Sequence, residues 1–288
     1  MVLAAGLGTR LRPLTDELPK ALVPVGDMPL LGQIFARLAR GGVTQVVLNT
    51  HHLPLAFESL VRAAPLSVQV INEPSLLGTA GALANARSFL GTGTVIVYNA
   101  DILVEFNLDA LLAGTHDGAP CLMVAEARAK GTVGVDASNC VARLRGERFG
   151  EVIRETDYVG VMALPAALIS ELPAQGCLVG DYLLPRLRRA ESVRTVPARG
   201  AWCDVGSLAS YWQANMSWLE RTVGVGASWC GPGASLGENV RLRSSLIGAN
   251  AKVVGSGELR DCVVWPGATV RAPLQRAIVT AAGNVVPC

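Results

Sequence analysis

The opening of the chain places two glycines and two cations where they could bind phosphate. Gly6 and Gly8 follow the short apolar run 2–5, and glycine permits turns that expose backbone N–H groups to an anion. Arg10 offers a planar fork of donors for phosphate oxygens, and Lys20 offers a mobile point charge. This spacing favours phosphate chemistry, whereas a Gly-x-Gly pair alone is also consistent with an ordinary turn after a strand.

The opening turn differs from two common phosphate-binding loops. Leu11 stands where a dinucleotide-binding Gly-x-Gly-x-x-Gly motif needs its third glycine. A Walker loop requires a Gly-Lys-Ser/Thr triplet, and none follows this turn. The sequence therefore indicates a phosphate loop of another kind.

Two aspartates have the character of ligands for a divalent cation. Asp101 directly follows an apolar, β-branched run at 94–98, and Asp204 lies in the locally apolar stretch 201–206. Burying a carboxylate is costly unless it is paired or bound to a cation, and Mg²⁺ prefers oxygen ligands with substrate phosphates completing its shell. The alternative for Asp204 is a brace or cap for the helix that follows it.

A glycine-rich segment after the run 67–71 could bring a ligand close to the backbone. Gly78 and Gly81 allow a close approach, and Thr79 between them is placed as the N-cap of a helix. An ordinary capped helix start is the alternative for this segment.

The elements that would position these residues follow an alternating pattern. Short β-branched runs at 45–48, 67–71, 94–98 and 121–125 are separated by segments with helical spacing. This pattern predicts an α/β fold with a mostly parallel sheet covered by helices. Ligands of such sheets bind beyond the carboxyl ends of the strands, which is where Asp101 and the glycine-rich segment fall.

The last part of the chain has a different period. Apolar residues recur there every five or six positions, which predicts hexapeptide coils of a β-helix; they are Leu236, Leu242, Ile247, Val253, Leu259, Val264 and Val270. We expect this tail to be structural and to pair subunits of a homo-oligomer. An acyltransferase site is disfavoured because the tail contains no histidine.

Composition restricts the remaining possibilities. The 288 residues carry a net charge of only +2 and half of them are apolar, which predicts a globular protein that binds neither nucleic acid nor membrane. Seven cysteines without a Cys-x-x-Cys pair predict free thiols of a reducing cytoplasm. Because the first strand would begin at Met1 and Val2, we also expect the true start to lie a residue or more earlier.

The string LAAGLGTRLRPLT, with PKALVPVGDMPLL behind it, resembles the signature of the sugar-1-phosphate nucleotidylyltransferases. The string Trp202-Cys203-Asp204-Val205-Gly206 is similar to that family's W-x-D-V-G motif. The resemblance implies a Rossmann-like nucleotidyltransferase domain over residues 1–222 and a left-handed parallel β-helix over residues 223–288.

The resemblance also implies roles for individual residues. Arg10, Lys20 and Asp101 would be catalytic, and Asp101 with Asp204 would hold Mg²⁺. The nucleotide site would comprise Leu3, Ala4, Ala5, Gly6, Gly8, Thr9, Arg10, Glu73, Gly78, Thr79 and Gly81, and the sugar-phosphate site Lys20, Arg154 and Gly160. Many relatives hold the sugar phosphate with the lysine of a Glu-Lys-Pro segment; this chain has no lysine over residues 152–157, where Arg154 could substitute or Lys20 could act alone.

Substrate expectations follow from Glu73. In relatives a side chain near this position reads the edge of the base, and a carboxylate, which only accepts hydrogen bonds, pairs best with the N1–H and N2–H₂ donors of guanine. We therefore expect GTP and a sugar-1-phosphate, with GDP-mannose as the favoured product. A UDP- or dTDP-sugar pyrophosphorylase acting on glucose-1-phosphate or N-acetylmuramate-1-phosphate is one alternative, and a catalytically silent regulatory subunit is the other.

Overall fold

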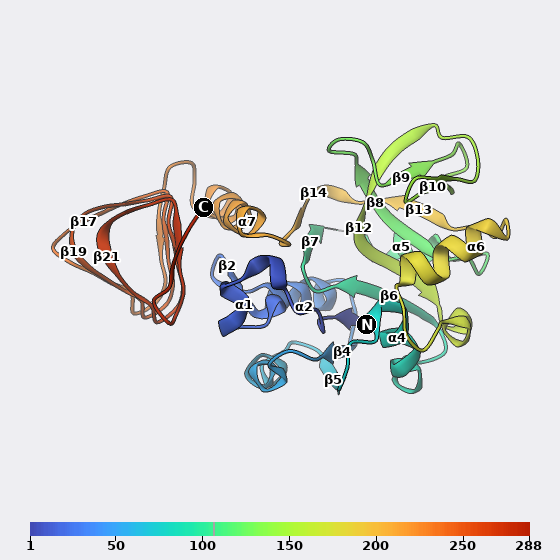
Figure 1. The fold of residues 1–288 in the computed structure, drawn as a ribbon, viewed down its shortest axis with the longest axis horizontal. Coiled ribbons are helices and arrows are strands. Elements are labelled where there is room, and N and C mark those ends of the chain that lie inside the picture. Colours follow the sequence, from blue (N-terminus) through green and yellow to red (C-terminus); the bar gives the residue numbers. More distant parts are fainter. Residues whose placement is uncertain (106) are drawn as a thin grey trace. The chain divides into compact units, whose positions relative to one another are not determined.

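The computed structural model describes residues 1–105 and 107–288, and its chain forms two compact units. Unit 1 comprises Met1–Gly6 and Ile34–Trp202, and unit 2 comprises Leu7–Gln33 and Cys203–Cys288. The first 33 residues are therefore divided, because the start of the first strand packs in unit 1 and the following segment packs with the end of the chain. Figure 1 follows the chain from blue to red.

Unit 1 is built on a ten-stranded mixed sheet whose centre is parallel. Strand β1 (Val2–Leu3) lies between β4 (Gln45–Thr50) and β6 (Thr94–Asn99), parallel to both, and β5 (Ser67–Asn72) extends this part beyond β4. These strands coincide with the β-branched runs of the sequence, so the predicted α/β fold with a largely parallel sheet is confirmed.

The other half of the sheet is mostly antiparallel. Strand β12 (Arg154–Pro165) runs antiparallel to β6 and also pairs with β8 (Cys121–Glu126). Its amino end therefore lies at the same edge of the sheet as the carboxyl end of β6. The remaining strands here are β9 (Val133–Val135), β10 (Val141–Leu144), β11 (Glu147–Arg148) and β13 (Arg194–Pro197).

Helices bury their apolar residues against this sheet. Helix α4 (Gly78–Ala86) contributes Ala80, Leu83 and Ala86, each fully buried, to a core that it shares with strand residues such as Val97 and Leu164. The other helices that lie in this unit wholly or in part are α2 (Leu30–Arg40), α3 (Glu58–Arg62), α5 (Leu108–Ala113) and α6 (Leu184–Arg188), the last preceded by a π-helix at Leu178–Leu183. Strand β7 (Ile102–Glu105) pairs with β14 (Arg199–Asp204).

Unit 2 begins with the glycine and cation segment. A 3₁₀ turn at Thr9–Leu11, helix α1 (Leu14–Glu17) and a second 3₁₀ turn at Lys20–Leu22 lead into the hairpin β2 (Pro24–Val25) and β3 (Met28–Pro29). The long helix α7 (Leu208–Thr222) packs against β2. Leu11 and Leu14 are fully buried, which fixes the turn between them.

The rest of unit 2 is a stack of coils with parallel strands, drawn in orange and red in Figure 1. One face is formed by β15 (Trp229–Cys230), β18 (Leu246–Ile247), β20 (Val263–Val264) and β22 (Ala277–Val279), closed by antiparallel β23 (Val285–Pro287). The second sheet contains β16 (Ser235–Leu236), β17 (Asn239–Arg243), β19 (Lys252–Arg260) and β21 (Thr269–Gln275).

The periodic apolar residues of the tail mostly point into this coil. Ile247, Val253, Leu259, Val264 and Val270 are all buried. Leu236 is 43% exposed and Leu242 is half-buried because both belong to the first coil. The prediction of repeated inward-facing positions is therefore confirmed for the inner coils and wrong for the first.

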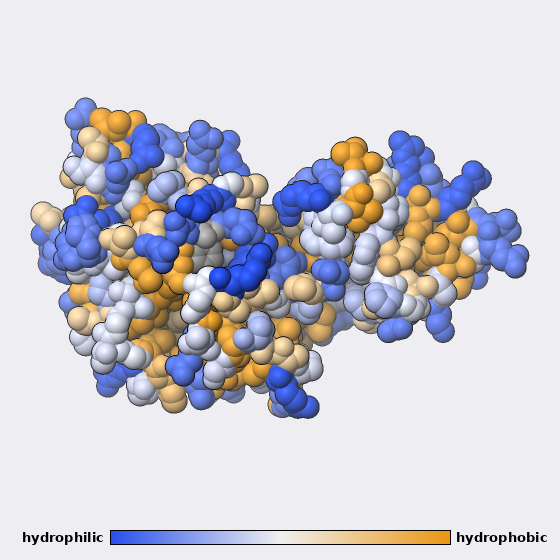
Figure 2. Space-filling model, turned by 180° about the vertical axis from the view of Figure 1, so that it is seen from behind, coloured by the Kyte–Doolittle hydropathy of each residue, from blue (hydrophilic) through white to orange (hydrophobic). Residues whose placement is uncertain are grey.

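No helix within residues 1–105 and 107–288 has both the length and the apolar character needed to cross a bilayer. The seven cysteines are all free thiols, as predicted. Burial raises the pKa of the Cys121 thiol to about 12 and that of Cys262 to about 11, so both stay protonated near neutral pH. On the face shown in Figure 2, hydrophilic and hydrophobic residues are interspersed.

Candidate functional site

The carboxyl ends of β1 and β6 meet at one edge of the sheet in unit 1. The backbone N–H of Ala100 donates to the carbonyl of Leu3 at 3.0 Å, which extends the pairing of the two strands past their ends. The N–H of Ala4 turns to the side chain of Asn49, whose Oδ1 accepts it at 2.9 Å. The predicted nucleotide-binding residues Leu3, Ala4 and Ala5 therefore lie beside the turn that carries Asp101.

A buried polar network ties this edge to the next strand. Asn49 lies near the carboxyl end of β4, and its Nδ2 donates to Glu73 Oε1 at 2.8 Å. The other carboxylate oxygen of Glu73 accepts the N–H of Leu77 at 3.2 Å, and the Glu73 side chain is only 2% exposed. The Glu73 carboxylate is thus engaged within the protein and braces the loop before α4, while its predicted contact with a base stays a prediction.

The glycines before and within α4 accommodate another loop of unit 1. Gly78 has a φ of +73°, and a β-carbon there would lie 2.4 Å from the carbonyl oxygen of Gly176. A β-carbon on Gly81 would lie 2.6 Å from the carbonyl oxygen of Ala174. The close approach predicted for these glycines is therefore made, within this structure, by the backbone of residues 174–176.

Thr79 does not cap α4, so that prediction is wrong. The helix begins at Gly78, and its N-cap residue is Leu77, which forms no side-chain cap. Thr79 Oγ1 instead accepts the backbone N–H of Leu178 at 2.7 Å. The π-helix packs against α4, and this packing brings its first residue to the Thr79 hydroxyl.

Gly160 allows the turn that carries Asp101 to pack against β12. Its φ is +78° and it lies in an irregular stretch of the β12–β8 pairing. A β-carbon on Gly160 would lie 2.9 Å from Asn99 Nδ2 and 2.8 Å from Ile102 Cγ1, which flank the Ala100-Asp101 turn. The predicted sugar-phosphate residue Gly160 and the predicted metal ligand Asp101 are therefore neighbours in unit 1.

Arg154 starts β12 and lines a cavity of about 670 Å³. The cavity lies where β8 and β13 end, with Glu126, Thr156 and Pro197 among its lining residues. Arg154 Nη2 donates to Asn139 Oδ1 at 2.6 Å. This places a guanidinium beside an open volume at the edge of the sheet where β6 also ends.

In unit 2 the turn at Gly8 has the left-handed conformation that its sequence predicts. Gly8 has a φ of +64°, and a β-carbon there would lie 2.7 Å from Thr15 Cγ2 and 3.0 Å from Lys20 Cβ. The buried Thr15 hydroxyl donates to the Gly8 carbonyl at 2.9 Å. Lys20 therefore leaves the chain directly beside the Gly8 turn, as the phosphate-loop prediction requires.

Arg10 and Asp204 come together at Gly206. A β-carbon on Gly206 would lie 3.2 Å from Arg10 Nη2 and 2.8 Å from Asp204 Oδ1. Helix α7 is capped by Ser207 and Ser210 in a capping box, so the helix start is satisfied without Asp204. Asp204 is therefore not the cap of this helix, whereas a bracing role for it stays untested, and its carboxylate lies beside the Arg10 guanidinium.

The acids fit a hard divalent cation by their chemistry. Asp101 and Asp204 both offer carboxylate oxygens directly after or at the end of a strand, and Mg²⁺ takes such ligands together with phosphate oxygens. Because Gly206 has no side chain, it leaves free the space beside the Asp204 carboxylate that the β-carbon of any other residue would occupy.

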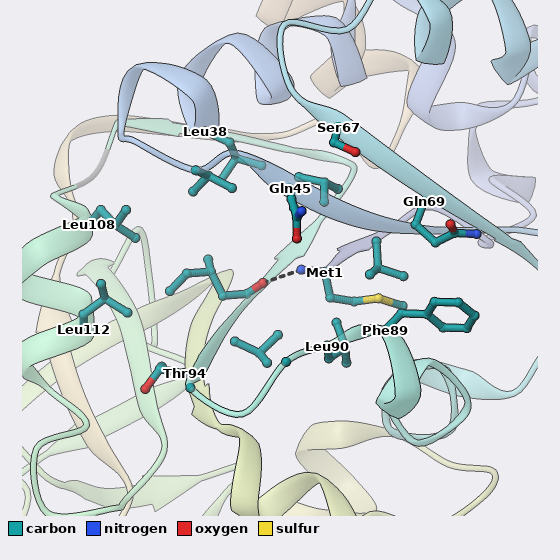
Figure 3. Close-up of a pocket in the computed structure, with 17 residues that line it drawn as sticks. Met1, Leu38, Gln45, Ser67, Gln69, Phe89, Leu90, Thr94, Leu108 and Leu112 are labelled. Carbon is teal, nitrogen blue, oxygen red and sulfur yellow. Dashed lines mark hydrogen bonds between the residues drawn. The ribbon is translucent and has the colours of Figure 1, made fainter.

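A second cavity, of about 520 Å³, lies at the opposite edge of the sheet (Figure 3). It is lined by Met1 and by the first residues of β4 and β6, among them Gln45 and Thr94, with Leu38 and Phe89 around them. Ligands of parallel sheets bind at the carboxyl ends of strands. This largely apolar cavity is therefore separate from the predicted site residues of unit 1.

Several residues that shape the site escaped the sequence prediction. Asn49 was detectable only as a polar residue ending a buried strand, and its partners Ala4 and Glu73 are distant in sequence. Glu17 belongs to a helix of four residues, and its partners Thr280, Ala282 and Asn284 lie at sequence separations of 263, 265 and 267. Their roles arise from long-range contacts that no local pattern encodes.

The sequence and the fold are similar to those of known proteins. Residues 1–143 match the family model described as Nucleotidyl transferase. A mannose-1-phosphate guanylyltransferase of Mycobacterium tuberculosis is 37% identical over 115 residues, which are 39% of this chain and 32% of that relative. A probable mannose-1-phosphate guanylyltransferase 2 of Arabidopsis thaliana is 28% identical over 94% of this chain and 82% of that relative.

A mannose-1-phosphate guanyltransferase of Schizosaccharomyces pombe is 29% identical over 73% of this chain and 61% of that relative. The chain thus spans between 32% and 82% of the lengths of these three relatives.

Solved structures show the same fold. HddC from Yersinia pseudotuberculosis has a TM-score of 0.64 at 23% identity and covers 75% of this chain and 97% of its own. The same protein complexed with GMP-PN has a TM-score of 0.65. The fold is a mixed α/β nucleotidyltransferase fold with a largely parallel central sheet. Residues 1–143 are thus similar to nucleotidyl transferases, and the chain as a whole is similar to mannose-1-phosphate guanylyltransferases.

Proposed function

We propose that this protein joins GTP to mannose-1-phosphate, releasing pyrophosphate and forming GDP-mannose. The observation that carries the proposal is the meeting of Arg10 and Asp204 at Gly206, beside the Gly8 turn and Lys20 of the same unit. The names of the three relatives support guanine and mannose as the specific substrates.

The proposed chemistry is an in-line displacement at phosphorus. An oxygen of the sugar phosphate forms a bond to the α-phosphorus of the triphosphate while the bond from that phosphorus to the β-phosphate bridge oxygen breaks. The electron pair leaves with pyrophosphate. A phosphate monoester is already an anionic nucleophile near neutral pH, so no side chain needs to remove a proton, and alignment with charge neutralisation supplies the catalysis.

The cations of unit 2 have separate tasks in this scheme. Backbone N–H groups around Gly6 and Gly8 would hold the triphosphate, and Arg10 would bind the departing β- and γ-phosphates. Lys20 would contact the attacking phosphate and the α-phosphate, where a flexible ammonium can follow the moving charge. Both cations would bind charge that grows as the reaction proceeds.

Nucleotidyltransferases of this family generally use a divalent metal ion, and we propose Mg²⁺ held by Asp101 and Asp204. The ion would neutralise negative charge on the phosphates. Asp204 suits this role because Ser207, not Asp204, caps α7. The other half of the ligand set, Asp101, is held at its turn by the Ala100–Leu3 hydrogen bond and the close packing of Gly160.

The sugar end of the site is proposed to lie at Arg154. This residue borders the cavity of about 670 Å³ at the site edge of the sheet, and a guanidinium suits a phosphate oxygen. We also propose that the coiled tail is a left-handed β-helix and that it pairs subunits of a homo-oligomer, as its repeat pattern predicts.

Pyrophosphate release from each of the four common triphosphates, with a panel of sugar-1-phosphates and Mg²⁺, tests the proposal. We expect GTP with mannose-1-phosphate to give the highest kcat/KM. A higher value with UTP or dTTP would replace the proposed substrates, and release with no pair would favour a regulatory subunit.

A further inference from the structure

The turn that closes the β-helix surrounds a carboxylate from the opening segment. Glu17, the last residue of α1, accepts hydrogen bonds at Oε1 from the Thr280 hydroxyl and from Asn284 Nδ2, the latter at 2.9 Å. Its Oε2 accepts the backbone N–H of Ala282 at 3.0 Å. Three donors from one five-residue turn therefore converge on one side chain, and hydrogen bonds to an ionised acceptor are the stronger kind.

The turn itself is rigid enough to act as an anchor. Thr280 is fully buried, its N–H donates to the Asn284 carbonyl at 3.0 Å, and its hydroxyl oxygen accepts the Asn284 N–H at 3.2 Å. Strand β23 follows it directly and pairs with β22. The donors are thus set in place by the β-helix, independently of Glu17.

Glu17 stands two residues from the contact that shapes the Gly8 turn. Thr15, on the same short helix, donates to the Gly8 carbonyl and packs beneath that glycine. Because α1 has only four residues, a displacement of Glu17 would also displace Thr15. The position of α1 therefore sets the position of the turn that precedes Arg10.

A second connection joins the β-helix to the same segment. Trp265 Nε1 donates to the Tyr211 hydroxyl at 2.8 Å, and that hydroxyl donates to the carbonyl of Pro24 at 2.6 Å. Asn215 Oδ1 accepts the N–H of Gly26 at 2.9 Å. The segment is therefore held after Lys20 by α7 and the β-helix and before Lys20 by Glu17.

We propose that the β-helix positions the phosphate-binding segment, and that Glu17, through the turn at residues 280–284, is a positioning residue for Arg10 and Lys20. This inference rests on the proposed function, and it gives the tail a task within its own subunit besides any pairing of subunits. Loss of the hydrogen bonds between Glu17 and the turn at residues 280–284 would let α1 and the Gly8 turn move. Arg10 and Lys20 would then meet the phosphates in the correct geometry less often.

Two single variants and their double variant test the hydrogen bonding between Glu17 and the turn at residues 280–284. Glu17→Gln directs an amide at the Ala282 and Asn284 donors, and Asn284→Asp directs a carboxylate at Glu17. We expect each single variant to lower kcat/KM by about tenfold, with kcat reduced, since a hydrogen bond to a charged group has been lost. The double variant lets the new glutamine donate to the new aspartate, and we expect it to recover most of the lost activity.

The matched control is Asp16→Asn, one residue away. Asp16 forms an exposed ion pair with Arg12, at 3.2 Å, so we expect kcat/KM within about twofold of the starting value. Single variants with unchanged kcat/KM would overturn the proposal, as would a double variant no better than its parents.

Hydrogen exchange of the amides of residues 8–22, without substrate, gives a readout that does not need activity. We expect faster exchange in both single variants, protection restored in the double variant, and unchanged exchange in strands β19 and β21. Unchanged exchange over residues 8–22 in the single variants would overturn the positioning role of Glu17. A protein with no transferase activity but the expected exchange would overturn only the proposed function.

Discussion

The Arg10 guanidinium and the Asp204 carboxylate both border Gly206, although the two residues are far apart in the sequence. A β-carbon at Gly206 would lie 3.2 Å from Arg10 Nη2 and 2.8 Å from Asp204 Oδ1. The fold thereby brings the cation of the opening segment to an acid about two hundred residues later, which is the first requirement of a shared phosphate and metal site.

The first prediction concerns that glycine. In Gly206→Ala the new methyl group would press on both Arg10 and Asp204, so we expect kcat to fall by about tenfold or more while the protein stays folded. Steady-state kinetics and a thermal melt measure the two effects. Gly93→Ala is the control, because a β-carbon at Gly93 meets open space; activity equal to that control would mean that the Gly206 space is not needed.

The second prediction concerns the two cations. Lys20→Ala and Arg10→Ala each remove a group proposed to bind developing charge, so we expect kcat to fall by about 10²-fold or more. Arg12→Ala, which removes an exposed arginine in an ion pair with Asp16, should change kcat by less than about twofold. An equal loss in all three variants, measured by pyrophosphate release, would point to general destabilisation instead.

The third prediction separates two roles of Glu73. Glu73→Gln places an amide against the donors of Asn49 and Leu77, so we expect the free energy of unfolding to fall by about 1–3 kcal/mol. Because the carboxylate oxygens are already engaged, we expect the ratio of kcat/KM for GTP over UTP to stay within about threefold. A larger change in that ratio would support contact with the base.

The sheet was predictable because its strands are short β-branched runs, most of which are largely buried in β4, β6 and β8. The residues at 45–48, 67–71, 94–98 and 121–125 all fall within observed strands. Inward-facing residues of the tail were predictable for the same reason, since burial requires a fixed repeat. The first coil departed from that repeat at Leu236, which the coil leaves exposed.

Tertiary contacts decided the features that the sequence did not show. Thr79 has a good N-cap residue type, but the π-helix packs against it and takes its hydroxyl. Ser207 caps α7 with Ser210 in a capping box, so Asp204 is not the cap of this helix. Residues 7–33 associate with α7 and the coiled tail through Tyr211, Asn215 and Glu17, and these contacts span too many residues for a local sequence window to show them.

The most direct measurement is the anomalous density of Mn²⁺ in crystals of the protein with a non-hydrolysable GTP analogue. We predict an ion that lies about 2.0–2.6 Å from a carboxylate oxygen of Asp101 and of Asp204 and that also touches a phosphate oxygen. An ion bound by only one of these residues, with the two carboxylates about a dozen ångströms apart or more, would contradict the account.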